Sequence, residues 1–139
     1  MPVLNEHALA LIASPVLGHL VTINPDGSPQ VTCVWTAVED GEIVIGHLTR
    51  HRKVRNVESD PRVAISWQAP GRNAYGLDEY LVVYGSARVT EGGAPELLQR
   101  LAAKYFDDGR RFPDMDDPPP GVITRIRPER VGGVGPWTA

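Results

Sequence analysis

The chain has 139 residues, 42% of them hydrophobic, and its 14 Lys and Arg against 17 Asp and Glu give a formal net charge of -3. This length predicts one folded domain, and the acidic balance argues against a general nucleic-acid-binding protein. There is no apolar run of about 18 residues to span a membrane and only one cysteine, Cys33, and because residues 1–6 lack basic and apolar blocks we expect no secretion signal. Because a lone cysteine cannot form an internal disulfide, we expect a cytoplasmic protein.

The first half of the chain predicts a short helix followed by strands. Residues 5–13 are predicted to form the helix, with Asn5 as its cap. Residues 18–37 predict two strands joined by the turn sequence Asn-Pro-Asp-Gly. A further strand is predicted at residues 43–47, and a second helix at about residues 50–59.

The second half predicts three more strands, at residues 62–68, 80–90 and 122–128. Residues 69–79 are predicted to form a loop. A third helix should run from Pro95 to about Tyr105, followed by an acidic, proline-rich loop at residues 107–121 and, after the last strand, an extended tail. About six strands with early hairpins favour a mainly β (α+β) fold, a closed or partly closed antiparallel barrel with helices packed against it.

The most informative segment is GHLTRHRKVRN at residues 46–56, where a strand should end and a helix begin after a cap at Thr49. The start of a helix carries partial positive charge and free N–H groups, so basic residues are unfavourable there unless an anion neutralises them. Five basic residues nevertheless gather there: Arg50, His51, Arg52, Lys53 and Arg55. We interpret the segment as a phosphate-binding site, and the alternative is a solvated basic face.

The strand at residues 30–37 has two chemically different faces. The more hydrophobic face is predicted to be core, and it consists of Val31, Cys33, Trp35 and Ala37. The other face carries Gln30, Thr32, Val34 and Thr36. Its hydrogen-bonding groups around a small apolar residue would suit the edge of a flat heteroaromatic ring, and a plain solvent-facing side is the alternative.

Other motifs restrict the chemistry further. His47 and His51 have the spacing of a helical metal pair, but His47 precedes the helix, so no metal site is expected. Trp137, in a glycine-rich tail, is predicted to anchor that tail on its own core or on a second subunit, or to pack beside a ligand. The sequence contains no recognisable motif that pairs a catalytic nucleophile with a base, so any catalysis would depend on a cofactor.

Four segments of the chain resemble one known group of proteins: LVTINPDGSPQVTCVW, IVIGHLTRHRKVRNVESDPRVAISW, YLVVYGSARVT and RIRPERVGGVGPW. They are similar to the split-barrel flavin-binding superfamily of pyridoxamine-phosphate-oxidase-like proteins, and more narrowly to the branch that uses the deazaflavin coenzyme F420. The resemblance implies a six-stranded antiparallel split barrel and a homodimer with cofactor sites between the subunits. Residues 125–130 lack the histidine of the Arg-x-His substrate motif of true pyridoxamine-phosphate oxidases, so that substrate is not expected.

The resemblance also assigns residues to the cofactor. Along its ring system would lie Gln30, Thr32 and Val34. Bordering the ring and the chain attached to it would be His47, Leu48 and Thr49. Holding its phosphate would be Arg52 and Lys53, helped by Arg50, His51 and Arg55. Trp137 would match an aromatic residue of the tail in some relatives.

The activity that the resemblance implies is transfer of a hydride between reduced F420 and an organic acceptor. F420 is favoured over flavin mononucleotide (FMN) because the extra cations at Arg50 and Arg55 would suit its anionic oligoglutamate tail. The predicted loops at residues 70–79 and 107–121 would shape the acceptor cavity. No proton-donating side chain is required, although Tyr75 or Tyr80 is available, and no nucleic-acid or membrane partner is expected.

Three alternatives remain open from the sequence. The first is an FMN-dependent oxidoreductase of the same fold. The second is a non-catalytic protein that carries F420 or a flavin. The third is a basic-patch module for RNA or an acidic partner, which would show steeply salt-dependent binding.

Overall fold

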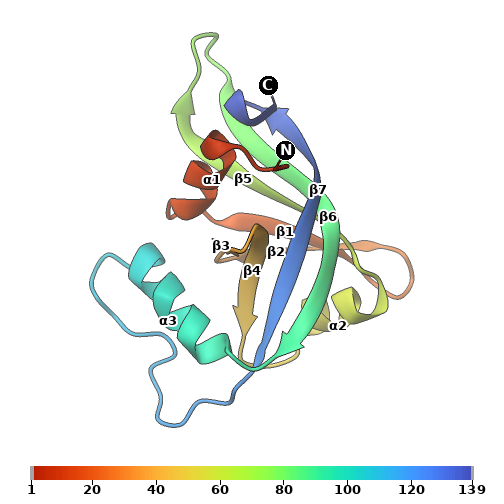
Figure 1. Ribbon diagram of the computed structural model, residues 1–139, viewed down its shortest axis with the longest axis vertical. Coiled ribbons are helices and arrows are strands. Elements are labelled where there is room, and N and C mark those ends of the chain that lie inside the picture. Colours follow the sequence, from red (N-terminus) through yellow and green to blue (C-terminus); the bar gives the residue numbers. More distant parts are fainter. Residues whose placement is uncertain (1, 139) are drawn as a thin grey trace.

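One antiparallel sheet of seven strands forms the body of the protein in the computed structural model, which describes residues 2–138 (Figure 1). The strands are β1 (Gly18–Ile23), β2 (Pro29–Val34), β3 (Ala37–Glu39), β4 (Glu42–His47), β5 (Arg62–Arg72), β6 (Asp78–Glu91) and β7 (Val122–Val134). Their order across the sheet is β2-β1-β5-β6-β7-β4-β3, and each neighbouring pair is antiparallel. The predicted antiparallel, mainly β class is therefore confirmed.

The predicted count of six strands is wrong because the expected strand at residues 30–37 is divided into β2 and β3. Thr36 leaves the ladder at this point: its N–H donates to the Tyr105 hydroxyl at 3.1 Å, and its Oγ1 accepts from Trp67 Nε1 at 3.0 Å. β2 and β3 thus become the two edges of the sheet. No ladder in residues 2–138 joins those edges, so the sheet is open, and the expectation of a closed or partly closed six-stranded split barrel is corrected.

Three α-helices lie beside the sheet: α1 (Glu6–Ala13), α2 (Arg52–Ser59) and α3 (Ala94–Tyr105). The Asn5 side chain accepts from the N–H of Ala8 at 2.9 Å, so the predicted cap of α1 is confirmed. Pro95 lies in the first turn of α3, as predicted. None of the helices described is long and apolar enough to cross a membrane.

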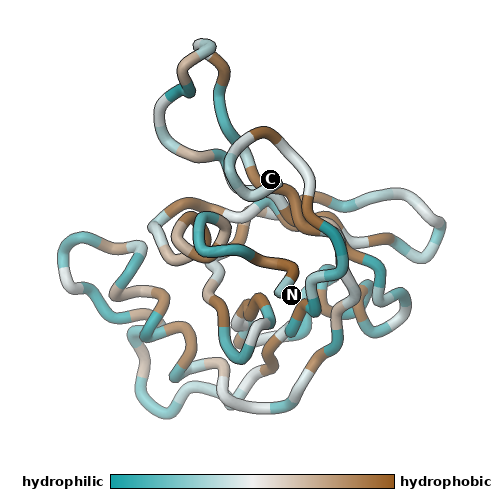
Figure 2. The backbone as a smooth tube through the Cα atoms, turned by 45° about the horizontal axis from the view of Figure 1, so that its top comes forward, coloured by the Kyte–Doolittle hydropathy of each residue, from teal (hydrophilic) through white to brown (hydrophobic). Residues whose placement is uncertain are grey.

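Two hydrophobic clusters hold these layers together. The main core includes the fully buried Trp67, Leu81 and Ile126. A second cluster under α3 includes Val44 of β4 and Leu97. Each fully buried aliphatic side chain contributes about 1.5–3 kcal/mol relative to exposure. The outer loops are mainly hydrophilic (Figure 2).

The predicted loop at residues 69–79 is mostly strand. β5 continues to Arg72 and β6 begins at Asp78, so the two strands form a hairpin arm that projects from the body (Figure 1). The Asn73 side chain closes the tip by accepting from the N–H groups of Tyr75 and Leu77 at 2.9 and 3.0 Å. These hydrogen bonds of a single side chain therefore stabilise the turn at the tip of the arm.

The predicted tail is largely strand as well, because β7 continues to Val134 before a 3₁₀ turn, η1 (Pro136–Thr138). Trp137 is buried in the main core, and its Nε1 donates to the Tyr80 carbonyl at 2.8 Å. Of the alternatives that the sequence left for this residue, anchoring on its own core is the one seen. Ala139, the last residue of the predicted tail, lies outside the described residues.

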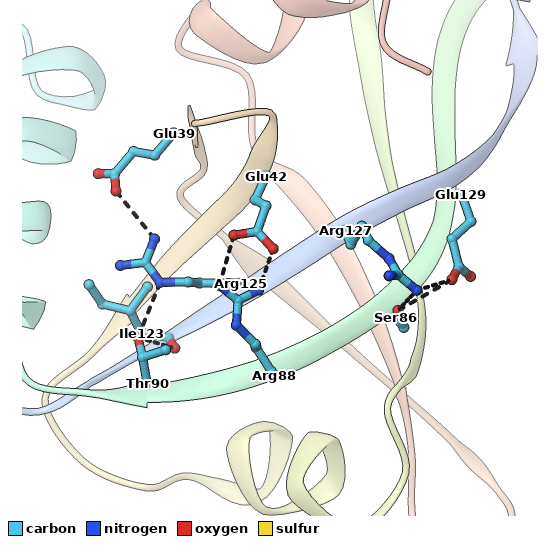
Figure 3. A network of polar contacts seen from close by, with 9 residues as sticks. All are labelled: Glu39, Glu42, Ser86, Arg88, Thr90, Ile123, Arg125, Arg127 and Glu129. Atoms are coloured by element: carbon cyan, nitrogen blue, oxygen red, sulfur yellow. Dashed lines mark hydrogen bonds and ion pairs between the residues drawn. The ribbon is translucent and has the colours of Figure 1, made fainter. Parts of the chain in front are cut away.

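Charged side chains of β3, β4, β6 and β7 pair with one another (Figure 3). Three arginine–glutamate pairs are visible: Arg88 with Glu42, Arg125 with Glu39, and Arg127 with Glu129. We call this group the paired face. Each of its three arginines has a carboxylate partner within the protein.

Candidate functional site

A cavity of about 340 Å³ opens between β2, β4, α2 and α3. Its volume lies at the small end of the roughly 300–1,000 Å³ typical of ligand pockets. One part of its wall is basic and polar, with Lys53 and His47, and another part is aromatic, with Trp35, Phe106 and Phe112. The cavity therefore combines a site for an anion with a wall for a flat, apolar group.

The aromatic wall is organised around Trp35. This ring stacks on Tyr105, with 5.3 Å between centroids and 5° between planes, and meets Phe106 and Phe112 edge-on at 5.0 and 5.6 Å. Trp35 was predicted to be core, but it is only half-buried and lines the cavity. Phe106 and Phe112 were not predicted from the sequence. They could have been noticed as large aromatic residues next to and within the hydrophilic, proline-rich segment at residues 107–121.

The loop at residues 107–121 carries Phe112 to this wall. Gln99 of α3 holds the loop by donating from Nε2 to the Pro113 carbonyl at 3.0 Å. At the other end of the loop, Gly121 has φ +61°, and a Cβ there would lie 2.2 Å from the His47 carbonyl oxygen. This close approach requires glycine and places the end of the loop against the end of β4.

The start of α2 supplies the basic part of the cavity. Arg52 and Lys53 occupy the first turn, which contains no acidic residue, and Lys53 is half-buried in the cavity wall. Burial lowers the pKa of the Lys53 ammonium below its usual range. Neither side chain has a carboxylate within ion-pair distance among residues 2–138.

The predicted cap of α2 is wrong. The cap position is His51, which makes no side-chain capping bond, whereas Thr49 Oγ1 and His51 Nε2 share a hydrogen bond of 2.9 Å. Thr49 and His51 are exposed and Leu48 is half-buried, and none of the three lines the cavity. The free N–H groups at the start of α2 are therefore not satisfied by a cap side chain.

The other predicted cations are engaged elsewhere. Arg50 forms an ion pair with Glu91, and its Nη2 lies 3.8 Å from Glu58. Arg55 donates from Nη1 to the Arg50 carbonyl at 3.1 Å. The basic segment therefore has two parts. Arg50 and Arg55 are bonded within the protein, whereas Arg52 and Lys53 have no carboxylate partner.

His47 lies at the end of β4, where only 4% of its surface is exposed. Its Nε2 shares a hydrogen bond of 2.9 Å with the Thr124 hydroxyl. Burial, with smaller effects of the charges on Lys53 and His51, lowers the pKa of His47 to about 3. His47 is thus neutral at neutral pH, and residues 2–138 contain no cluster of His, Cys, Asp and Glu that could hold a metal ion.

The two faces of β2 are the reverse of the prediction. Val31 is 62% exposed and Cys33 is exposed, whereas Val34 is buried. The polar face could turn inward because α2 covers it and binds Gln30. Thr32 lies on the same face of β2 as Val34 but is not part of the cavity wall. Its buried Oγ1 has no hydrogen-bond partner among the described residues. An unpaired buried hydroxyl costs about 1–3 kcal/mol, so a ligand that reached this atom would supply the partner that it lacks.

The remaining predicted residues lie outside the cavity wall. Gln30 bonds to α2, Trp137 is in the main core, and the hairpin arm with Tyr75 and Tyr80 contributes no side chain to the described lining.

Comparison with known proteins places this site in context. Residues 4–135 match the family model described as Pyridoxamine 5'-phosphate oxidase. A solved F420 reductase is 31% identical over 88% of this chain and 94% of its own, with a TM-score of 0.73. A conserved hypothetical protein from Mycobacterium tuberculosis is 28% identical over 93% and 83%, with a TM-score of 0.69. A heme binding protein from Mycobacterium smegmatis is 26% identical over 94% of this chain but 53% of its own, with a TM-score of 0.65.

Proposed function

Because this chain belongs to the pyridoxamine 5'-phosphate oxidase family, we propose that it is an oxidoreductase that holds a phosphate-bearing flavin or deazaflavin in the cavity beside α2. The family membership confirms the resemblance seen in the sequence. In its specific form, the proposal is transfer of a hydride between reduced F420 and an organic acceptor.

The observation that carries this proposal is the half-buried Lys53, which has no carboxylate partner and lies in a cavity whose other wall is aromatic. A cation at an uncapped helix start suits a phosphate, which can accept from the ammonium and from free N–H groups together. Trp35 and Phe112 suit a planar ring system. The bound cofactor would supply the hydride chemistry, and the protein would supply binding and orientation.

Individual residues fit this use of the cavity. Lys53 and Arg52 would hold the phosphate, and the Thr32 hydroxyl would bond a polar edge of the ring system. His47, neutral at neutral pH, would add no charge to the site.

The preference for F420 over FMN rests on the relative named F420 reductase, which is 31% identical. The sequence argument from extra cations is weaker in the structure, because Arg50 is paired with Glu91 and Arg55 bonds to backbone. FMN is therefore the alternative cofactor for the same site.

We also propose that the protein is a homodimer. Val31, on the edge strand β2, is a large apolar side chain with 62% of its surface exposed, and the exposed Cys33, two positions along the strand, also borders the cavity. A second copy covering this edge would remove apolar surface and an unpaired strand edge from water. Light scattering coupled to size-exclusion chromatography tests this proposal, and a monomer at all concentrations would contradict it.

Parallel fluorescence titrations with F420 and FMN test the cofactor, and a panel of organic acceptors added to the reduced cofactor tests the reaction. We expect micromolar binding of F420 and oxidation of its reduced form by at least one acceptor. Micromolar binding of FMN but not of F420 would mean that FMN is the cofactor. Binding without turnover would favour a carrier, and failure to bind either molecule would overturn the proposed function.

A further inference from the structure

A buried amide connects α2 to the β1–β2 hairpin. Asn56 has only 2% of its surface exposed. Its Nδ2 lies 3.1 Å from Thr22 Oγ1, 2.9 Å from Asn24 Oδ1 and 3.3 Å from Gln30 Oε1. An amide NH₂ has two hydrogens, so the three acceptors share them, and both donors of Asn56 are used in this contact.

The helix that carries Asn56 depends on such contacts. α2 has eight residues, no side-chain cap and two cations at its electropositive end. A helix this short is marginal alone, and cations at its start oppose the dipole. Val54 and Val57 are buried and attach α2 to the body, but apolar packing is not directional. Hydrogen bonds with defined partners fix the rotation of the helix more narrowly.

That rotation determines where Lys53 points. Lys53 and Asn56 are three positions apart, so their side chains leave neighbouring parts of the helix surface. With Asn56 fixed against β1 and β2, Lys53 enters the cavity wall. The exposed Arg52 and Arg55 flank it on the solvent side of the helix.

We propose that Asn56 is a positioning residue for anion binding: it holds α2 in the rotation that places the Lys53 ammonium in the cavity. This inference rests on the proposed function, since it assigns the phosphate of the cofactor to Lys53. The inference also changes the role of Gln30. Instead of contacting the ring system of the cofactor, as predicted from the resemblance, Gln30 would hold Asn56 in place.

The test compares ligands that differ in the phosphate. F420 is paired with the phosphate-free deazaflavin chromophore, and FMN with riboflavin, and the pair that binds the wild-type protein is used. The ratio of the two affinities measures the phosphate contribution. We expect Asn56→Ala to lower this ratio about tenfold or more, as for loss of a charge-assisted hydrogen bond, while the affinity for the phosphate-free ligand stays within about twofold.

Two further variants separate positioning from general damage. Val57→Ala removes core packing from the same helix without touching the amide network, and it should lower the melting temperature while leaving the ratio unchanged. If Asn56→Ala fails to fold, Asn56→Ser, which keeps a small neutral polar side chain but is too short to reach the three acceptors, takes its place. In a Lys53→Ala background the Asn56 substitution should change the ratio no further.

Three results would overturn the inference: a wild-type ratio in Asn56→Ala or Asn56→Ser, an equal loss of the ratio in Val57→Ala, or a full additional loss in the Lys53→Ala background. A wild-type protein that binds both members of a pair equally would contradict the phosphate site itself. That outcome is visible before any variant is made, so failure of the proposed function is distinguishable from failure of this inference.

Discussion

Two arginine-containing regions of this protein use their charge differently. On the paired face of β3, β4, β6 and β7, arginines lie opposite glutamates, as in the forked contact between Arg88 and Glu42 (Figure 3). At the start of α2, Arg52 and Lys53 have no such partner among residues 2–138, although Arg50 nearby does. Both regions are rich in cations, but only the second contributes a cation to the wall of the cavity between β2, β4, α2 and α3.

The comparison shows that the number of basic residues does not identify a binding site. A cation with a carboxylate partner already has its counter-charge, and an exposed pair of this kind contributes little to stability. A cation that is half-buried without a partner remains available to an anion, at some cost to the empty protein. The following predictions test this distinction, beginning with the largest expected effect.

Removing the unpaired cations should weaken cofactor binding most. For the double variant Arg52→Ala, Lys53→Ala we expect a loss of about 2 to 5 kcal/mol of binding free energy, nearer the lower value because solvent screens the exposed Arg52. Fluorescence titration measures it. The matched control is Arg88→Ala, Arg127→Ala, which removes the same charge from the paired face and should leave the affinity unchanged. Equal losses in both variants would mean that only net charge matters.

Acid should destabilise the protein through His47. Its pKa falls from 6.5 in the unfolded chain to about 3 in the folded protein, so below pH 6.5 protons bind preferentially to the unfolded state. The stabilisation is complete above pH 6.5 and is lost progressively down to about pH 3. At about 1.4 kcal/mol per pH unit, we expect a loss of about 2 kcal/mol between pH 6.5 and 5.

Urea unfolding at a series of pH values measures this slope. His47→Gln, which can still bond to Thr124 but does not titrate, is the control and should flatten the slope in that window. A slope that survives in the variant would mean that another group is responsible.

Replacing the Thr32 hydroxyl should separate binding from stability. In Thr32→Val the free energy of unfolding should be unchanged or higher, because Oγ1 has no partner in the protein. Cofactor affinity should fall by about 0.5–1.5 kcal/mol, the net value of one hydrogen bond. Calorimetry and titration of the same sample give both numbers. A loss of stability with unchanged cofactor affinity would mean that this hydroxyl bonds to another group of the protein and not to the cofactor.

The smallest effect is expected on the paired face. Arg88→Ala removes an exposed arginine from its contact with Glu42, so the melting temperature should change little. Thermal unfolding at low and at physiological salt measures the change. A large drop, or a parallel loss of cofactor affinity, would show that the paired face supports the site.

The sequence by itself determined the features that depend on near neighbours: the Asn5 cap of α1, the helix opened by Pro95, the antiparallel pairing around early turns, and the unusual cations at the start of α2. These follow from backbone preferences and charges within a few residues. The resemblance to a known family added an expected fold class and an expected class of cofactor.

Only the tertiary structure decided which face of β2 turned inward, that Glu91 would neutralise Arg50, and that Phe112 would line the cavity. Arg50 and Glu91 are 41 positions apart, and Asn56 reaches Gln30 across 26. Local patterns carry no information about such contacts, because packing brings distant segments together. Most inward-facing polar side chains need a hydrogen-bond partner, and here that partner often comes from a distant segment.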